Sequence, residues 1–277
     1  MARGDRARRR APPRTQDKGE TSKAIRNIAI VVLLVGLVSF FYVRSILSNR
    51  ALDEQTLCPT DVAGVTAVLI DVTDPMNTPQ RQDFRNQLDG LLSKIGRYEK
   101  LVVLKVNPIG DSLLTPVITK CNPGSAADVS EVDGNPKKLE RQYRDGFIAP
   151  MEKAFSRLLD ASGADRSPIM ESIQSVALSE FQPANLNGKP KRLIVASDLL
   201  QHTDRASFYE GLPDLQSFVQ SQDFNRVRTN LKGVEVELWL LQRDDSTQTQ
   251  PRALPDFWEQ IIKEQGGEVT RTYRVSG

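Results

Sequence analysis

Between Arg26 and Arg44 the chain carries 17 consecutive uncharged residues, NIAIVVLLVGLVSFFYV. As a helix this run spans about 25 Å, close to the minimum for crossing the hydrocarbon core of a bilayer. The two arginines would reach the interfaces, and the aromatic FFY near the end of the run resembles an interfacial band. The sequence therefore predicts a transmembrane helix over residues 27–43, with the rest of the chain folded outside the membrane.

Two other interpretations of the apolar run fit less well. A cleaved signal peptide normally has a shorter apolar region, and the following SILSNRALDE offers no convincing small-x-small cleavage site. A core helix of a soluble protein would present one polar face, which this run lacks. We therefore expect an uncleaved membrane anchor.

Charge is distributed unevenly along the chain and predicts its orientation. Residues 1–50 hold 11 Lys and Arg against 3 Asp and Glu, which leaves 26 of the 37 basic and 32 of the 35 acidic residues for the remainder. Nine basic residues precede the apolar run, including RARRR, and only Arg44 and Arg50 closely follow it. The positive-inside bias predicts a single-pass protein of the inner (cytoplasmic) membrane, with a cytoplasmic N-terminus and a periplasmic or extracellular C-terminal body.

The two ends of the chain differ in expected order and partners. Residues 1–26 form a basic tail with few apolar residues, which we expect to be disordered and able to touch anionic lipid. The mildly acidic body argues against nucleic acid as a partner. Residues 44–64 are expected to form a linker, and residues 65–277 a folded domain.

The pattern of the body alternates apolar strands with amphipathic helices. The expected strands are Thr66–Asp71, Leu101–Val106, Lys191–Leu200, Val234–Leu241 and Glu268–Val275, with Ser112–Thr119 as a further candidate that Pro116 restricts to an edge or antiparallel position. The expected helices begin at Thr78, run from Leu139 to Leu159 with an interruption at Pro150, begin again at Ser167, and occupy Leu254–Gln265. This order predicts an α/β fold, with a mainly parallel, doubly wound (Rossmann-like) sheet flanked by helices.

Cys58 and Cys121 are the only cysteines, and both lie on the expected exported side. A pair in an oxidising compartment is more often a disulfide than a metal site, and two sulfurs are too few ligands for zinc. A bridge at the lower edge of the sheet is the prediction, with two free buried thiols as the alternative.

Polar side chains gather where the predicted strands end. Asp71 and Thr73 follow the first strand, Ser167 opens a helix, and Asp198 follows the strand LIVAS. In an open α/β sheet, ligands bind at the carboxyl ends of the strands. Carboxylate and hydroxyl oxygens suit Mg²⁺ or Mn²⁺ rather than zinc. The alternatives are local: Asx and Thr turns for the loop acids, and a helix N-cap for the serine.

The order strand–acid–x–hydroxyl, a later hydroxyl opening a helix, and a later strand–Ser–Asp resembles a von Willebrand factor A (vWA) domain over about Thr66–Val275. In that family an Asp-x-Ser-x-Ser loop, a distant Thr and a distant Asp form a metal-ion-dependent adhesion site. The resemblance implies that Asp71, Thr73, Ser167 and Asp198 hold Mg²⁺ or Mn²⁺.

The sequence departs from the vWA motif at one position. The second Ser of the loop falls on Pro75, which has no side-chain ligand, so water or Asp74 would have to replace it. An acidic group of a protein partner would complete the coordination of a cation held in this way. The resemblance thus implies a membrane-anchored protein-binding module. The alternative is a metal-free scaffold subunit of an envelope, secretion or conjugation assembly.

Enzyme motifs are missing from the sequence. We find no GxSxG turn, no Gly-rich phosphate loop and no GxGxxG after the first strand. A hydrolase built on Ser197 and His202 is a third hypothesis, but SDLLQH lacks the glycines of a nucleophile turn. We therefore expect a binding protein and not an enzyme.

Overall fold

The computed structural model describes residues 18–48, 51–73, 75–107, 113–131, 134–159, 163, 165–243 and 250–275. Most of the predicted basic tail and Asp74 lie outside these ranges. The chain divides into two compact units, Met1–Arg50 and Ala51–Gly277.

The described part of the first unit is one helix, α1, Lys18–Ser48. Its segment Ser22–Val43 is long and apolar enough to cross a membrane, and its side chains are exposed. The expected span over residues 27–43 lies inside this segment. A large apolar surface with no protein packed on it is what a lipid-facing helix presents.

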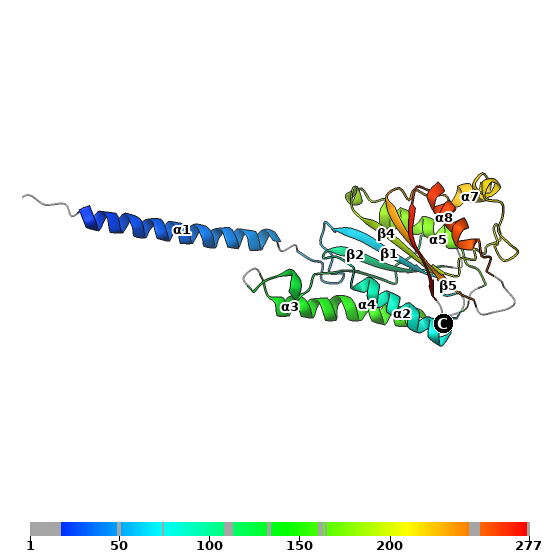
Figure 1. The fold of residues 1–277 in the computed structure, drawn as a ribbon, viewed down its shortest axis with the longest axis horizontal. Helices are drawn as coiled ribbons and strands as arrows, with labels where there is room; N and C mark the ends of the chain where they lie inside the picture. Colours follow the sequence, from blue (N-terminus) through cyan, green and yellow to red (C-terminus); the bar gives the residue numbers. More distant parts are fainter. Residues whose placement is uncertain are drawn as a thin grey trace, which may run out of the picture. The chain divides into compact units, whose positions relative to one another are not determined.

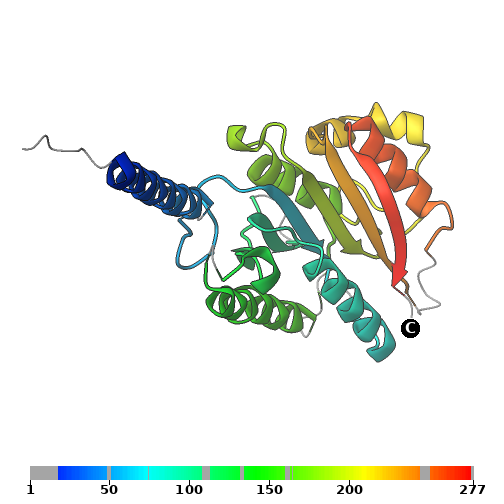
Figure 2. The same ribbon diagram turned by 60° about the vertical axis from the view of Figure 1, so that its left-hand side comes forward.

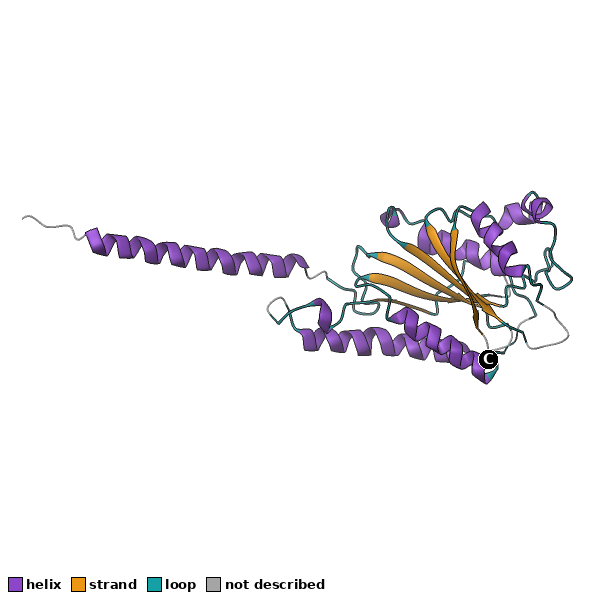
Figure 3. Cartoon of the chain, viewed as in Figure 1, coloured by secondary structure: helices purple, strands orange, loops and turns teal. Residues whose placement is uncertain are grey.

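The second unit, called the body from here on, is built on one six-stranded sheet (Figures 1 and 3). The strands are β1 Gly64–Ile70, β2 Glu99–Lys105, β3 Ile118–Cys121, β4 Lys191–Ser197, β5 Val234–Leu241 and β6 Glu268–Val275. Their order is β3-β2-β1-β4-β5-β6, and every neighbouring pair is parallel except β2 with β3. This is a doubly wound order, so the predicted fold class is confirmed.

Helices cover both faces of the sheet (Figure 2). They are α2 Thr78–Leu92, α3 Pro136–Arg141, α4 Ala149–Leu159, α5 Ile169–Val176, α6 Leu215–Val219, α7 Gln222–Val227 and α8 Leu254–Glu264. Shorter 3-10 segments are η1 Ala126–Asp128 and η4 Ala184–Leu186, and π-helical segments are η2 Gln142–Ile148 and η3 Ala177–Phe181. The core on one face includes Phe84 of α2 and Phe155 of α4, and the core on the other includes Trp258 of α8.

Local sequence explains the main elements. All seven residues of β1 are buried, as expected for a central strand covered on both faces. Helix α2 begins with a capping box in which the Asn77 side chain accepts from the Gln80 N–H and Gln80 accepts from the Asn77 N–H. The predicted interruption at Pro150 takes the form of the π-helical segment η2. Proline cannot donate a hydrogen bond in the helical ladder, so the turn before it widens.

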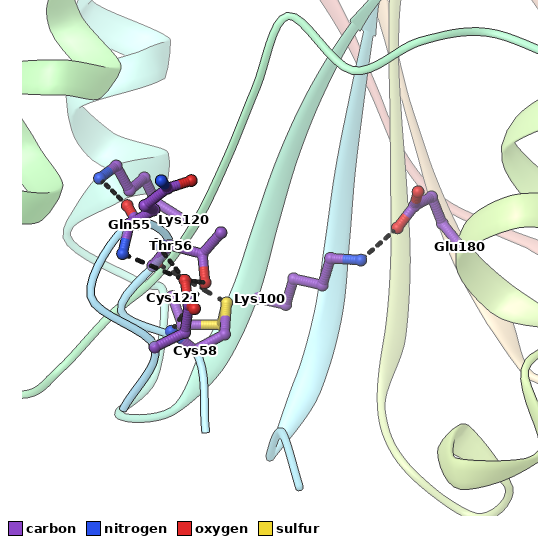
Figure 4. The surroundings of a disulfide bond; sticks show 8 residues. Gln55, Thr56, Cys58, Lys100, Lys120, Cys121 and Glu180 are labelled. Atoms are coloured by element: carbon purple, nitrogen blue, oxygen red, sulfur yellow. Dashed lines mark hydrogen bonds and ion pairs between the residues drawn. A yellow bond between two sulfur atoms is a disulfide. The ribbon is translucent and has the colours of Figure 1, made fainter. Parts of the chain in front are cut away.

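The predicted disulfide is present between Cys58 and Cys121 (Figure 4). It joins the segment before β1 to the end of the edge strand β3, which pairs antiparallel with β2 as expected but begins at Ile118, after Pro116, and not at Ser112. The segment before β1 is itself folded, because the Asp53 carboxylate accepts from the N–H and hydroxyl of Thr56. The compact body consequently begins at Ala51, and not at residue 65 as expected from the sequence.

Candidate functional site

Two neighbouring parallel strands place two acids at one edge of the sheet. Asp71 directly follows β1, and Asp198 directly follows β4. The Asp71 N–H donates to the Ala196 carbonyl at 2.8 Å, which continues the ladder to the edge. The exposed fractions of Asp71 and Asp198 are 3% and 5%, so both carboxyl groups are buried. We call this carboxyl-end edge of the sheet the rim.

The Asp71 carboxylate lies in a shell of hydroxyl donors. Thr73 donates to Oδ1 through its hydroxyl at 2.8 Å and its N–H at 3.0 Å. The Ser167 hydroxyl donates to Oδ2 at 2.6 Å, and the Ser197 hydroxyl donates to the same oxygen at 2.9 Å. The structure thus brings together all four predicted metal-binding residues. Asp198 lies beside the other three because it directly follows Ser197, whose hydroxyl contacts Asp71.

Asp198 has a different partner, which the sequence analysis missed. Its Oδ2 accepts from both Nε and Nη2 of Arg243, which lies two residues beyond the end of β5. The exposed fractions of the Arg243 and Asp198 side chains are only 12% and 6%. Oδ1 accepts from the Leu200 N–H at 2.9 Å. A basic residue just after a third strand of the same parallel sheet was the sequence signal that would have placed Arg243 at the rim.

The electrostatics of the rim are dominated by its burial. Removal from water, followed by repulsion from Asp71, raises the pKa of Asp198 to about 7, although the Arg243 guanidinium lowers it. Two buried acids and one guanidinium therefore share one small volume. The positive charge of Arg243 offsets the negative charge of the Asp198 carboxylate, which the nearby Asp71 would otherwise repel.

Side chains from the C-terminal part of the chain hold the backbone around Asp198 in place. Leu199 adopts φ 62°, in the left-handed region, and its carbonyl accepts from the Trp258 indole N–H at 2.8 Å. The Gln250 side-chain amide donates to the carbonyls of Asp198 and Leu241 at 2.9 and 2.8 Å. A buried non-glycine residue at positive φ costs free energy and persists only where the surrounding contacts impose it.

Residues at the rim do not fit a divalent cation in this arrangement. The hydroxyls of Thr73 and Ser167 donate to Asp71, which leaves their oxygen lone pairs available. The Asp198 carboxylate, however, is engaged by the Arg243 guanidinium, whose charge would repel a divalent cation. Pro75 supplies no ligand, as the sequence indicated. Among the residues that the structure describes, no group of three or more His, Cys, Asp or Glu is arranged to hold a metal. The role of these residues as metal ligands stays a prediction.

Two further expectations from the sequence can be compared with the structure. Ser167 is not the N-cap of α5, which begins at Ile169. Its backbone instead pairs with His202, and its hydroxyl is engaged by Asp71. The His202 ring lies against Tyr209, with centroids 4.6 Å apart, and its Nδ1 is 3.0 Å from the Ser207 hydroxyl. The Ser197 hydroxyl donates to Asp71.

A cavity of about 420 Å³ opens at the rim. It lies between the carboxyl ends of β1, β4 and β5 and the start of α2. Its lining residues are Asp71, Thr73, Pro75, Met76, Asn77, Gln80, Asp198, Leu241, Gln242 and Arg243. The cavity combines an apolar part with a few fixed polar groups, which is the composition of a ligand-binding cleft.

Comparison with known proteins gives structural neighbours only. No family model matches the chain, and no curated protein matches it. One similar solved structure is an aerotolerance-related membrane protein from Bacteroides fragilis, with 15% identity, coverage of 78% of this chain and 92% of that chain, and a TM-score of 0.37. Another is the conserved hypothetical protein BatB from Bacteroides thetaiotaomicron, with 11% identity, coverage of 78% and 91%, and a TM-score of 0.40.

Proposed function

We propose that this chain is a membrane-anchored protein-binding module whose rim works without a divalent cation. The observation that carries the proposal is the ion pair between Asp198 and Arg243. In the adhesion site that the sequence resembles, a metal supplies positive charge beside two acids. Here a guanidinium supplies that charge from within the chain.

Anchoring and export are part of the same proposal. Helix α1 is long and apolar enough to span a bilayer, and the basic excess before it favours a cytoplasmic N-terminus. The body then lies on the exported side of the inner membrane. The disulfide between Cys58 and Cys121 supports this side, because such bonds persist in oxidising compartments and are rare in the cytoplasm.

The cavity at the rim is the proposed docking point for a partner protein. Exposed Pro75 and buried Met76 supply part of its apolar lining, and Gln80 is fixed by donating to the Gln242 carbonyl. A partner side chain that enters this cavity would be held by shape and by these polar groups. We propose that the chain acts by binding and not by catalysis.

Capture of the partner from solubilised membranes tests this function. The tagged full-length chain should retain its partner equally in Mg²⁺ and in chelator. Pro75→Arg, which places a long charged side chain at the mouth of the cavity, should lose the partner. Pro183→Arg is the matched control, since Pro183 is exposed and lies before the start of β4, away from the rim.

The outcomes separate the candidate functions. Loss of the partner in chelator would support the cation-dependent adhesion mechanism instead. Retention by Pro75→Arg would show that the rim is not the docking surface, which would leave the scaffold alternative with contacts elsewhere on the body.

A further inference from the structure

A basic cluster lies at the end of the body opposite the rim. Lys137, Lys138, Arg141 and Arg144 are exposed and fall within eight residues of α3 and η2. Three of them line a cavity of about 330 Å³ together with Ala126, Pro136 and Glu140. A concave surface with three cations at its wall fits a phosphate-bearing group.

Two acids near this basic cluster are held by local hydrogen bonds, and a third, Asp145, is exposed next to Arg144. Glu140 accepts from the Ala126 N–H at 3.0 Å and is 3.9 Å from the Arg144 Nε. Asp128 caps the short helix η1 by accepting from the Ser125 N–H at 2.6 Å. The side chain of Arg144 is 67% exposed despite its neighbour. The four basic side chains therefore face solvent, with Asp145 as an exposed acid beside them.

The basic cluster lies at the end of the body where the chain arrives from the apolar helix. Gly146, at the end of the cluster, packs so closely on Leu57 that a Cβ built there would lie 2.8 Å from the leucine Cδ1. Leu57 precedes Cys58, and the disulfide fastens this segment to β3 (Figure 4). Figure 1 shows α3 beside the ends at which β1 and β2 begin.

Covalent connection limits how far this end can be from a membrane. Ala51, the first residue of the body, is only eight residues beyond Val43, the last residue of the apolar span. Even a fully extended chain of that length reaches only about 30 Å. If α1 spans the bilayer, Ala51 lies within that distance of the lipid headgroups, which brings the basic cluster within reach of them.

We propose that Lys137, Arg141 and Arg144 bind the headgroups of anionic phospholipid in the membrane that holds α1. This inference rests on the anchoring part of the proposed function. Attraction to an anionic surface acts over about the Debye length and is screened by salt. The contact would hold the body with its amino-terminal strand ends toward the membrane and its rim away from it, where a partner can reach the cavity.

Lysine footprinting of the full-length chain in nanodiscs tests the contact. Acylation of Lys137 should be several-fold slower in discs with 30% phosphatidylglycerol than in phosphatidylcholine discs. Lys153, exposed on α4, should react at the same rate in both and serves as the internal control. Salt at 0.5 M should remove the difference at Lys137.

Charge-reversal variants complete the footprinting test. Arg141→Glu/Arg144→Glu should abolish the lipid dependence at Lys137, whereas the control Arg85→Glu/Arg157→Glu, on exposed positions of α2 and α4, should keep it. Equal acylation in both discs, or an unchanged response in the first variant, would overturn the lipid contact. Failure of the chain to enter discs at all would instead refute the anchoring, and the lipid contact with it.

Discussion

Replacement of Arg243 by methionine should destabilise the body strongly. The substitution keeps an unbranched stem of the side chain but removes the guanidinium, so the buried Asp198 carboxyl beside Asp71 loses its cation. Removing one partner of a buried ion pair costs about 3–5 kcal/mol. For a domain of this size each kcal/mol lowers the melting temperature by about 2–4 °C, so we expect a decrease of about 6–20 °C.

Two variants separate the buried pair from a general effect of losing an arginine. Arg166→Met breaks an ion pair with Asp204 whose side chains are 48% and 74% exposed, and should cost less than about 1 kcal/mol. Arg243→Met/Asp198→Asn removes both charges and should recover most of the loss. Urea unfolding of the body, Ala51–Gly277, supplies the free energies. All the buried core residues lie between Val62 and Val275, so the body has its own core.

The pH dependence of the stability loss in Arg243→Met is an independent test of the buried ion pair. The folded-state pKa of Asp198 is raised from 3.8 to about 7, so the fold favours the neutral acid and the stability contributed by this group decreases as pH rises between about 4 and 7. Arg243 lowers that pKa, and its loss raises it further. Arg243→Met should therefore cost more at pH 8 than at pH 5.5. A cost no larger than that of Arg166→Met, or one independent of pH, would refute the reasoning.

Two further predictions concern the shell of Asp71 and the disulfide. Ser167→Ala removes one of two hydroxyl donors from Oδ2 of buried Asp71, and urea unfolding should show a loss of about 1–3 kcal/mol; a loss below about 0.5 kcal/mol would mean that the contact is not formed. Cys58→Ser/Cys121→Ser opens a crosslink between residues 63 positions apart and should cost about 2–5 kcal/mol. Mass spectrometry of thiol-blocked exported protein should find neither cysteine alkylated, and alkylation of both would contradict the bond.

The sequence predicted those parts of the fold that depend on local pattern. Strand β5 matches the predicted Val234–Leu241, because an apolar run with few charges has one stable place in a buried sheet. The edge, antiparallel position expected for Ser112–Thr119 was correct, but the strand itself runs from Ile118 to Cys121 and excludes Pro116, since proline cannot donate to a ladder. The alternation of strands and helices was enough to predict the doubly wound order.

The contacts between distant segments were harder to predict. Convergence of Asp71 and Asp198 followed from the rule that parallel strands end at one edge. Arg243 was missed because the sequence analysis followed only acids and hydroxyls at the strand ends, although Arg243 lies two residues beyond β5 at the same edge, 45 positions from its partner. Ser167 was expected to cap a helix, but its backbone pairs with the distant His202, so α5 begins only at Ile169, and its hydroxyl donates to Asp71.

Titration of the body with Mn²⁺ at pH 7.5, followed by calorimetry and by the unfolding midpoint, tests most directly whether Arg243 takes the place of a metal at the rim. We predict no saturable heat and no change of the midpoint. Stoichiometric binding of Mn²⁺ that is lost in Asp71→Asn would contradict the account and would return the rim to the cation-dependent mechanism.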